Sequence, residues 1–379
     1  MTKVLYFSRD FSPHDHRFLS ALAETSHEVF WLRLEKRGRR LEERQVPAQV
    51  KQINWRGGER PVGWLQALTL IGDLRRVIRE VHPDLIHAGP VHTTAFLAAA
   101  AGFRPLVTMS WGSDLLYDVE RSAVARWAAR YTLRRTTVFT GDCQAVQEKA
   151  AELGFPPEKS VLFPWGVDLE RFSSGNYADI REWLSWRDKF VILSMRSWEP
   201  VYGVDVLVRG FARAARQIPD LRLLLLGGGS QKRLLYKILS KNKVLDRVQF
   251  AGQVRQDDLP DYYCSADLYV SPSHSDGSSV SLMEALASGL PAIVSDIPGN
   301  REWITPGEQG WLFPDGDDEA LASLILQAYQ QRSQLPALGS AARQLAEQRA
   351  DWPRNFQKLL EAYQLALDIH SSSPRKVIP

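Results

Sequence analysis

Two carboxylates occupy unusual positions in the segment Ser271–Pro291, which reads SPSHSDGSSVSLMEALASGLP. Glu284 lies in an otherwise apolar run, where burying its charge is costly unless a cation or a hydroxyl group pairs with it. Asp276 precedes the helix predicted around Glu284, and the spacing allows both carboxylates to point to one side of the loop and the helix start. Sugar and ribose hydroxyl groups are suitable partners, whereas a structural salt bridge would explain Glu284 without a ligand.

The residues between these two carboxylates are typical of an anion-binding helix start. Gly277, Ser278, Ser279 and Val280 lead into the predicted helix, and either Ser278 or Ser279 is expected to cap it. Free backbone N–H groups at a helix start attract negative charge, and a pyrophosphate suits such a site. Helix capping alone would also explain the serines.

Arg196 is placed where a cation could bind phosphate. It follows the strand predicted at Phe190–Ser194, and a guanidinium group at a strand end is well suited to binding phosphate. An ordinary surface arginine is the alternative.

The elements that position these residues follow a βα pattern, in which short apolar runs alternate with helical periodicity. The pattern predicts strands at 4–8, 28–34, 85–87, 106–109, 137–140 and 161–163, and again at 190–194, 221–226, 248–251, 267–270, 292–295 and 311–313. We expect an α/β fold with two Rossmann-like domains, 1–170 and 171–351, whose parallel sheets face each other across a cleft. The final helix, 352–370, is expected to cross back to the first domain.

Composition narrows the function classes. The chain has 379 residues and a net charge of +3, so bulk charge does not favour a nucleic-acid partner. Its two cysteines cannot form a disulfide framework and match no metal motif.

With neither a signal peptide nor a run of about 20 apolar residues, the protein is expected to be cytoplasmic or peripheral to a membrane. The basic run Arg33–Arg44 and the arginines Arg126, Arg130 and Arg134 are either solvated faces or contacts for an anionic acceptor or lipid.

Several motifs in this order resemble the retaining glycosyltransferases of family four, which have the GT-B fold. A carboxylate, seven residues and then Glu-Ala-(Leu/Met)-Ala-x-Gly-x-Pro match Asp276 to Pro291. Pro164–Asp168 (PWGVD), followed by Arg171 and Phe172, resembles the linker motif of the family. Ile297–Ile304 (IPGNREWI) resembles the loop that follows in its members.

The resemblance implies a transfer of sugar from a nucleotide diphosphate sugar, such as a UDP- or GDP-sugar. It implies that Glu284 holds the ribose, that Asp276 contacts the transferred sugar, and that Arg196 neutralises the diphosphate. Arg196 and Asp276 are then the expected catalytic residues. The donor-binding residues would be Glu284, Gly277, Ser278, Ser279, Val280 and Lys232. The reaction is pictured as same-face attack in which the leaving diphosphate takes the acceptor proton, so no cofactor, metal ion or protein base is expected.

The chain departs from the family pattern at four positions. Asp276 replaces a glutamate, Tyr202 stands where a lysine follows the arginine, Trp165 replaces the linker asparagine, and Trp111 replaces the histidine of a His-Gly-x-Asp loop. Trp111 and Asp114 of this loop, together with His14 of the segment Phe11–Arg17 (FSPHDHR), are candidates for the acceptor side. A helix start without any ligand is the alternative for His14.

Two other functions would explain parts of this pattern. Gly227–Gly229 follow a predicted strand but form no complete dinucleotide motif, because Lys232 stands at the third glycine position of GxGxxG, and this argues against a nicotinamide-dependent oxidoreductase. A degenerate sugar-nucleotide-binding protein without transferase activity stays open, since the lysine and the histidine are missing. The acceptor could be a glycan, a lipid-linked sugar or a small molecule.

Overall fold

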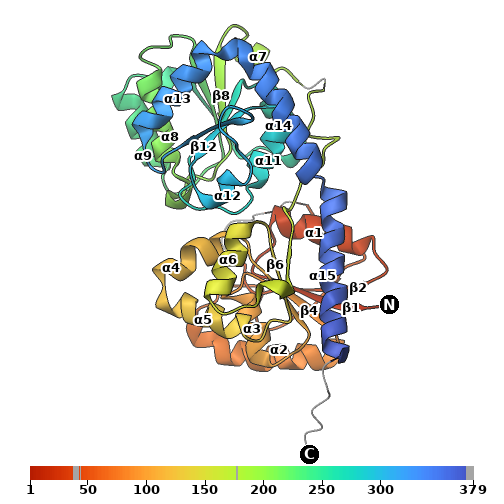
Figure 1. Ribbon diagram of the computed structural model, residues 1–379. Coiled ribbons are helices and arrows are strands. Elements are labelled where there is room, and N and C mark those ends of the chain that lie inside the picture. Colours follow the sequence, from red (N-terminus) through yellow and green to blue (C-terminus); the bar gives the residue numbers. More distant parts are fainter. Residues whose placement is uncertain (37–41, 43, 176–177, 373–379) are drawn as a thin grey trace, which may run out of the picture. The chain divides into compact units, whose positions relative to one another are not determined.

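A computed structural model describes residues 1–36, 42, 44–175 and 178–372 of the chain (Figure 1). The chain divides into two compact units. One comprises Met1–Phe163 together with Phe356–Pro379, and the other comprises Pro164–Asn355.

The first unit is built on a parallel sheet, which has seven strands among the described residues, in the order β3-β2-β1-β4-β5-β6-β7. The strands are β1 (Lys3–Ser8), β2 (Glu28–Arg33), β3 (Lys51–Gln52), β4 (Leu85–Gly89), β5 (Leu106–Met109), β6 (Val138–Gly141) and β7 (Ser160–Leu162). Most of these strands are buried along their length, as expected of a parallel sheet with helices on both faces.

Helices cover both faces of this first sheet. They are α1 (Pro13–Ala23), α2 (Ala67–Val81), α3 (Thr94–Ala101), α4 (Val119–Arg121), α5 (Ala123–Leu133) and α6 (Gln144–Glu152), with most of α15 (Trp352–Ser372). The helices α2, α3 and α5 pack on one face through a shared apolar core that includes Leu5 and Phe7 of β1. Tyr363 of α15 packs on the other face, against His87 of β4.

The second unit repeats the same plan. Its parallel sheet has the order β10-β9-β8-β11-β12-β13 in the part of the chain that the structure describes. The strands are β8 (Phe190–Ser194), β9 (Leu221–Leu226), β10 (Val248–Gly252), β11 (Leu268–Ser271), β12 (Ala292–Ser295) and β13 (Gly310–Phe313). The helices are α7 (Ile180–Trp183), α8 (Val204–Ala214), α9 (Lys232–Lys241), α10 (Leu259–Cys264), α11 (Val280–Ala287), α12 (Pro298–Arg301), α13 (Asp318–Gln330) and α14 (Leu335–Arg349).

Each sheet reverses its strand order once, between β1 and β4 in the first unit and between β8 and β11 in the second. In open α/β sheets, ligands bind at the carboxyl ends of the strands where the order reverses, because the loops diverge there and leave room. The loops after β8 and β11 therefore mark the expected ligand site of the second unit. The loops after β1 and β4 mark that of the first.

Two parallel α/β sheets confirm the predicted fold class. The strands predicted at 106–109, 190–194, 221–226 and 292–295 have the predicted bounds, and most others differ by one or two residues. The strand β3 was missed, because its two residues are exposed and carry no apolar alternation.

Candidate active site

Arg196 and Asp276 meet at the reversal point of the second sheet. Arg196 lies in the loop after β8 and Asp276 in the loop after β11, and Nη2 of the arginine is 2.6 Å from Oδ2 of the aspartate. Their side chains are 11% and 19% exposed. The two expected catalytic residues therefore form a largely buried ion pair that a ligand can still reach from solvent.

The other contacts of Arg196 come from α11 and from the loop before α8. Its Nη1 donates to Ser279 Oγ at 2.7 Å and to Ser281 Oγ at 3.1 Å. The guanidinium group lies over the ring of Tyr202, 4.4 Å from the ring centroid, which is a cation–π contact. Its Nε is buried without a hydrogen-bond partner.

Burial and charge act in opposite directions on this pair. Burial raises the pKa of the Asp276 carboxyl, and the adjacent Arg196 guanidinium opposes that rise. Burial also lowers the pKa of Arg196, but the neighbouring Asp276 and tyrosine side chains outweigh it, so the pKa lies above its ordinary value. Arg196 therefore stays cationic and can meet an anionic ligand.

The loop between Asp276 and α11 differs from the predicted capping arrangement. Ser279 occupies the cap position, but its side chain accepts no hydrogen bond from the helix backbone. Ser278 Oγ instead accepts from Trp303 Nε1 at 3.0 Å. Ser279 is thus the N-cap residue, as predicted, but its hydroxyl group contacts Arg196 and does not bond to the helix backbone. Val280 is the first residue of α11, so the helix begins directly beside Arg196.

Gly277 lies where two segments meet closely. Its backbone N–H donates to Asp276 Oδ1 at 3.1 Å. A Cβ atom on Gly299, at the start of α12, would lie 2.5 Å from the Gly277 carbonyl oxygen. The loop that carries Asp276 is thus held against α12, and this contact requires glycine at 299.

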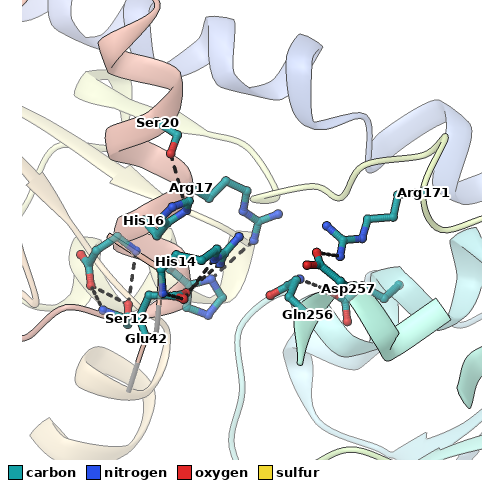
Figure 2. Close-up of polar contacts among 12 residues, drawn as sticks. Ser12, His14, His16, Arg17, Ser20, Glu42, Arg171, Gln256 and Asp257 are labelled. Carbon is teal, nitrogen blue, oxygen red and sulfur yellow. Dashed lines mark hydrogen bonds and ion pairs between the residues drawn. The ribbon is translucent and has the colours of Figure 1, made fainter. Parts of the chain in front are cut away.

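Glu284 is 4% exposed and is held by neutral side chains. Its Oε2 accepts from Tyr263 Oη at 2.8 Å and its Oε1 from Gln256 Nε2 at 3.4 Å; Figure 2 labels Gln256. Burial, and then the charge of Glu284, raise the pKa of Tyr263, so its phenol remains a donor. The same Tyr263 hydroxyl proton is shared with the backbone oxygen of Ser281 at 3.0 Å, which links Glu284 to the residue that contacts Arg196.

Lys232 is the first residue of α9 and is exposed. The loop before it packs against the segment that carries Arg196, since Trp198 N donates to the Gly228 carbonyl oxygen at 3.0 Å. A Cβ atom on Gly229 would lie 2.6 Å from the Trp198 carbonyl oxygen. Lys232 thus begins the helix next to the site, but no contact with Asp276 or Arg196 is found among the described residues.

Asp315 and Asp317 have an Asp-x-Asp spacing after β13, but protein groups hold both carboxylates. Asp315 Oδ1 is 2.6 Å from His274 Nδ1. Asp317 Oδ1 caps α13 by accepting from the N–H groups of Glu319 and Ala320 at 3.0 and 2.9 Å. These contacts explain the pair without a ligand.

His14 lies in the first turn of α1, after the reversal point of the first sheet (Figure 2). Its ring centroid is 5.5 Å from that of Trp111, and its Nδ1 is 3.5 Å from Arg17 Nη2. Ser12 and Asp15 form a reciprocal capping box at this helix start. The structure thus brings two of the three candidate acceptor-side residues together, although a helix cap also accounts for their segment.

Asp114, the third of these candidates, is 2% exposed. It accepts bonds from Val91 N at 2.8 Å, Ser110 Oγ at 2.7 Å and Trp111 N at 2.9 Å. Burial raises the pKa of its carboxyl. These contacts tie the loop after β5 to the loop after β4, so its visible role is to position Trp111.

Three residues of the site were not predicted from the sequence. Tyr263 and Gln256 hold Glu284, and Ser281 contacts Arg196. The two serines Ser279 and Ser281 have a spacing that could have been noticed, because it places both hydroxyl groups at one helix start. Of the basic run Arg33–Arg44, the residues 37, 39 and 40 lie outside the described residues.

Two family models match this chain, one after the other. Residues 14–171 match the family model described as Glycosyltransferase Family 4, and residues 178–345 match the model described as Glycosyl transferases group 1. A GDP-mannose-dependent alpha-(1-6)-phosphatidylinositol monomannoside mannosyltransferase of Mycolicibacterium smegmatis is 25% identical over 77% of this chain and 79% of its own length. The protein of the same name from Mycobacterium tuberculosis H37Rv is 24% identical over 95% of this chain and 98% of its own.

Solved structures share the fold over nearly the whole chain. Anabaena HepE in complex with UDP-glucose has a TM-score of 0.79 and 20% identity, covering 96% of this chain and 100% of that one. The sucrose-phosphate synthase of Thermosynechococcus elongatus has a TM-score of 0.80 and 19% identity, covering 98% and 100%. The two family models and the GT-B architecture of these structures confirm the predicted family and fold. This chain belongs to the family-four glycosyltransferases of the GT-B fold and is a hexosyltransferase-type enzyme.

Proposed function

We propose that this enzyme transfers a sugar, with retention of configuration, from a UDP- or GDP-sugar to its acceptor. One observation carries the proposal: a buried arginine, a carboxylate and the start of α11 converge at the reversal point of the second sheet. A buried cation next to a helix start is well suited to a diphosphate. The relatives are consistent with either base, since HepE is complexed with UDP-glucose and the mycobacterial enzymes are named for GDP-mannose.

Each site residue then has a distinct task. Glu284, aligned by Tyr263, would accept hydrogen bonds from the donor ribose, and Asp276 would contact the transferred sugar. Arg196 and the N–H groups at the start of α11 would stabilise the charge that develops on the leaving diphosphate. A diphosphate oxygen would take the acceptor proton on the same face of the sugar, so the protein needs no dedicated base. Catalysis would consist of positioning and charge stabilisation, without a metal ion.

The experiment is a donor panel. Purified enzyme is incubated with UDP- and GDP-sugars, and release of UDP or GDP is measured with and without candidate acceptors. The anomeric configuration of the product, read by NMR, decides between retention and inversion. Binding of a donor without hydrolysis or transfer to any acceptor would favour a degenerate sugar-nucleotide-binding protein, and an inverted product would refute retention.

For the acceptor, we infer a lipid-linked molecule at an anionic membrane surface. Two neighbouring helices of the first unit expose apolar side chains near their starts and arginines further along. At the start of α2, the exposed Leu65 and Leu68 precede Arg75 and Arg79. On α5, the exposed Val124 and Trp127 precede Arg130 and, directly after the helix, Arg134. Both helices contact α3, and Figure 1 shows the three together on one side of their sheet. Apolar side chains flanked by arginines suit an interface rather than a membrane span.

No helix among the described residues is long and apolar enough to cross a bilayer. Binding of the α2 and α5 surface to lipid is tested by sedimentation with vesicles of phosphatidylglycerol or of phosphatidylcholine. Arg130→Glu/Arg134→Glu should abolish binding to the anionic vesicles, and Trp127→Ser should weaken it. Lys237→Glu/Lys241→Glu on α9 makes the same charge change in the other unit and should leave binding intact. No binding of the wild type to anionic vesicles at low salt would remove the lipid surface.

A further inference from the structure

In the Arg196 guanidinium group, Nη2 has a hydrogen-bond partner but the neighbouring Nε has none. Its Nη1 is occupied by Ser279 and Ser281, and its face lies over Tyr202. The remaining edge carries Nε and Nη2, whose N–H groups point in the same direction and can hold two oxygen atoms at once. On that edge only Nη2 has a partner, because Nε is buried without one.

Asp276 contacts Nη2 through one oxygen and is also hydrogen-bonded to the Ser279 side chain. Its Oδ2 accepts from Arg196 Nη2 at 2.6 Å, whereas its Oδ1 accepts from the Gly277 N–H at 3.1 Å. The second oxygen is thus committed to the loop of Asp276 itself and leaves Nε unsatisfied. A buried donor without an acceptor is destabilising. An anion that satisfied both Nε and Nη2 would remove that destabilisation.

A counter-ion is needed at this place when no ligand is bound. The Arg196 side chain is 11% exposed, and a charge so deeply buried requires an opposite charge beside it. Asp276 supplies that charge, but it does so with one contact on an edge built for two. Its side chain is 19% exposed, so the carboxylate lies on the open side of the pair.

We propose that Asp276 is a displaceable counter-ion of Arg196, which the diphosphate of an incoming donor replaces on the Nε–Nη2 edge. The proposal rests on the proposed function in one respect, that Arg196 meets the diphosphate. Two phosphate oxygens satisfy both donors, and the released carboxylate becomes available to hydroxyl groups of the transferred sugar. No bond is made or broken in this exchange. Asp276 thereby couples donor binding to assembly of the sugar site.

The contacts on the other sides of Arg196 allow the exchange without loss of position. Ser279 is the N-cap residue of α11, Ser281 lies in its first turn, and the partly buried Tyr202 packs against the core of the second unit. These groups hold the guanidinium plane while Asp276 leaves. The arginine is therefore the fixed partner and the aspartate the moving one.

The test is the affinity for UDP and for GDP, both without a sugar, measured by isothermal titration calorimetry. Asp276→Asn removes the competing charge with little change of shape and should bind the preferred nucleotide about three- to tenfold more tightly, as expected for a largely buried ion pair that no longer has to be broken. Asp276→Glu can reach both Nε and Nη2 and should bind that nucleotide more weakly than the wild type. Sugar transfer should fall in Asp276→Asn, because the sugar loses its carboxylate.

Glu199→Gln is the matched control for nearby charge. Glu199 lies three residues after Arg196 and accepts from Ser230 N at 2.9 Å, without a contact to the guanidinium among the described residues. It should change nucleotide affinity much less than Asp276→Asn does. Thermal melting shows that each variant is folded, and Asp276→Glu still tests the exchange if Asp276→Asn is not.

Three results would count against the exchange, and they differ in what else they overturn. Unchanged or weaker nucleotide binding by folded Asp276→Asn, with normal binding by the wild type, would overturn the exchange and leave the proposed function standing. Failure of the wild type to bind either nucleotide would overturn both. An equal gain in Glu199→Gln would show a general charge effect and would also refute displacement.

Discussion

The Tyr263 hydroxyl donates a 2.8 Å hydrogen bond to Glu284, a carboxylate that is almost fully buried on α11. The bond crosses from α10 to α11 and fixes one carboxylate oxygen. Gln256 Nε2, 3.4 Å from the other oxygen, makes a longer and weaker contact. Oε1 is therefore the oxygen better able to accept a ligand hydroxyl group.

Glu284→Gln should weaken binding of the nucleotide without unfolding the protein. A hydrogen bond to a charged group is worth about 1.5–3 kcal/mol, so the loss in affinity should be about tenfold to a hundredfold. Calorimetry with UDP and GDP measures it, and a thermal melt controls for folding. Tyr263→Phe should cause a smaller loss, because the carboxylate keeps its charge. Normal binding with a much lower melting temperature would instead identify Glu284 as a structural residue.

The sequence predicted the sheets well because parallel strands that are buried on both faces are nearly continuous apolar runs. The strand β8 (FVILS) and the strand β12 (AIVS) are such runs, and each is followed by a helical pattern. Strand order was not predictable from these runs, because it depends on which strands pair across the sheet. The reversal between β8 and β11, which locates the site, appears only in the folded chain.

The site was predictable in its residue types but not in its pairings. Glu284 stood out because its charge lies inside an apolar run, and Asp276 and Arg196 because they lie next to predicted buried elements. The contact between Arg196 and Asp276 joins residues 80 positions apart, and spacing along the chain cannot show that the two charges meet. The sequence shows that Tyr202 stands where the family has a lysine. Only the structure shows that the Tyr202 ring lies under the Arg196 guanidinium group.

Tyr202 should act as a positioning residue for Arg196. Tyr202→Phe keeps the aromatic face and should retain turnover within about twofold, because a cation–π contact of about 0.5–1 kcal/mol depends on the ring. Tyr202→Leu loses that face and should lower kcat about two- to fivefold with a smaller change in KM. Steady-state kinetics on both variants decide the matter. Equal losses in the two variants would assign the effect to the hydroxyl group instead.

Acid should destabilise the protein through His87. Burial lowers the pKa of this imidazole to about 3, and its Nδ1 is 2.6 Å from the Tyr363 hydroxyl oxygen. In the unfolded chain a histidine titrates near about 6.5, so between these values only the unfolded state binds the proton. Stability is therefore complete above about pH 6.5 and falls as the pH drops below it. Between pH 7.5 and 5.5 the loss from His87 should be about 1.4 kcal/mol.

Asp15 acts in the opposite direction over the same range. Burial raises the pKa of its carboxyl to about 6, so below that pH the folded state binds a proton that the unfolded state does not. It adds stability as the pH falls, by about 0.8 kcal/mol between pH 7.5 and 5.5.

The contribution of His87 is measured by urea unfolding of His87→Gln at both pH values, which should no longer show the loss of stability in acid that His87 causes. His370→Gln, at an exposed position of α15, should keep it. Equal pH dependence in wild type and His87→Gln would exclude His87 as the cause.

Arg196→Ala should lower turnover far more than stability. A preorganised donor to a developing anion is worth about 2.7–4 kcal/mol in the transition state, so kcat should fall about 100- to 1,000-fold. The variant leaves the Asp276 carboxylate without its cation, and Arg196→Ala/Asp276→Asn removes that charge as well. The double variant should recover the melting temperature of the wild type but not its turnover, which separates the two roles.

Arg196→Lys should rescue only part of kcat, because a point charge cannot hold two phosphate oxygens in the planar geometry of a guanidinium group. EDTA should leave wild-type turnover unchanged. Loss of activity in EDTA that magnesium or manganese restores would show that a metal ion neutralises the diphosphate, and that Arg196 does not carry this role alone.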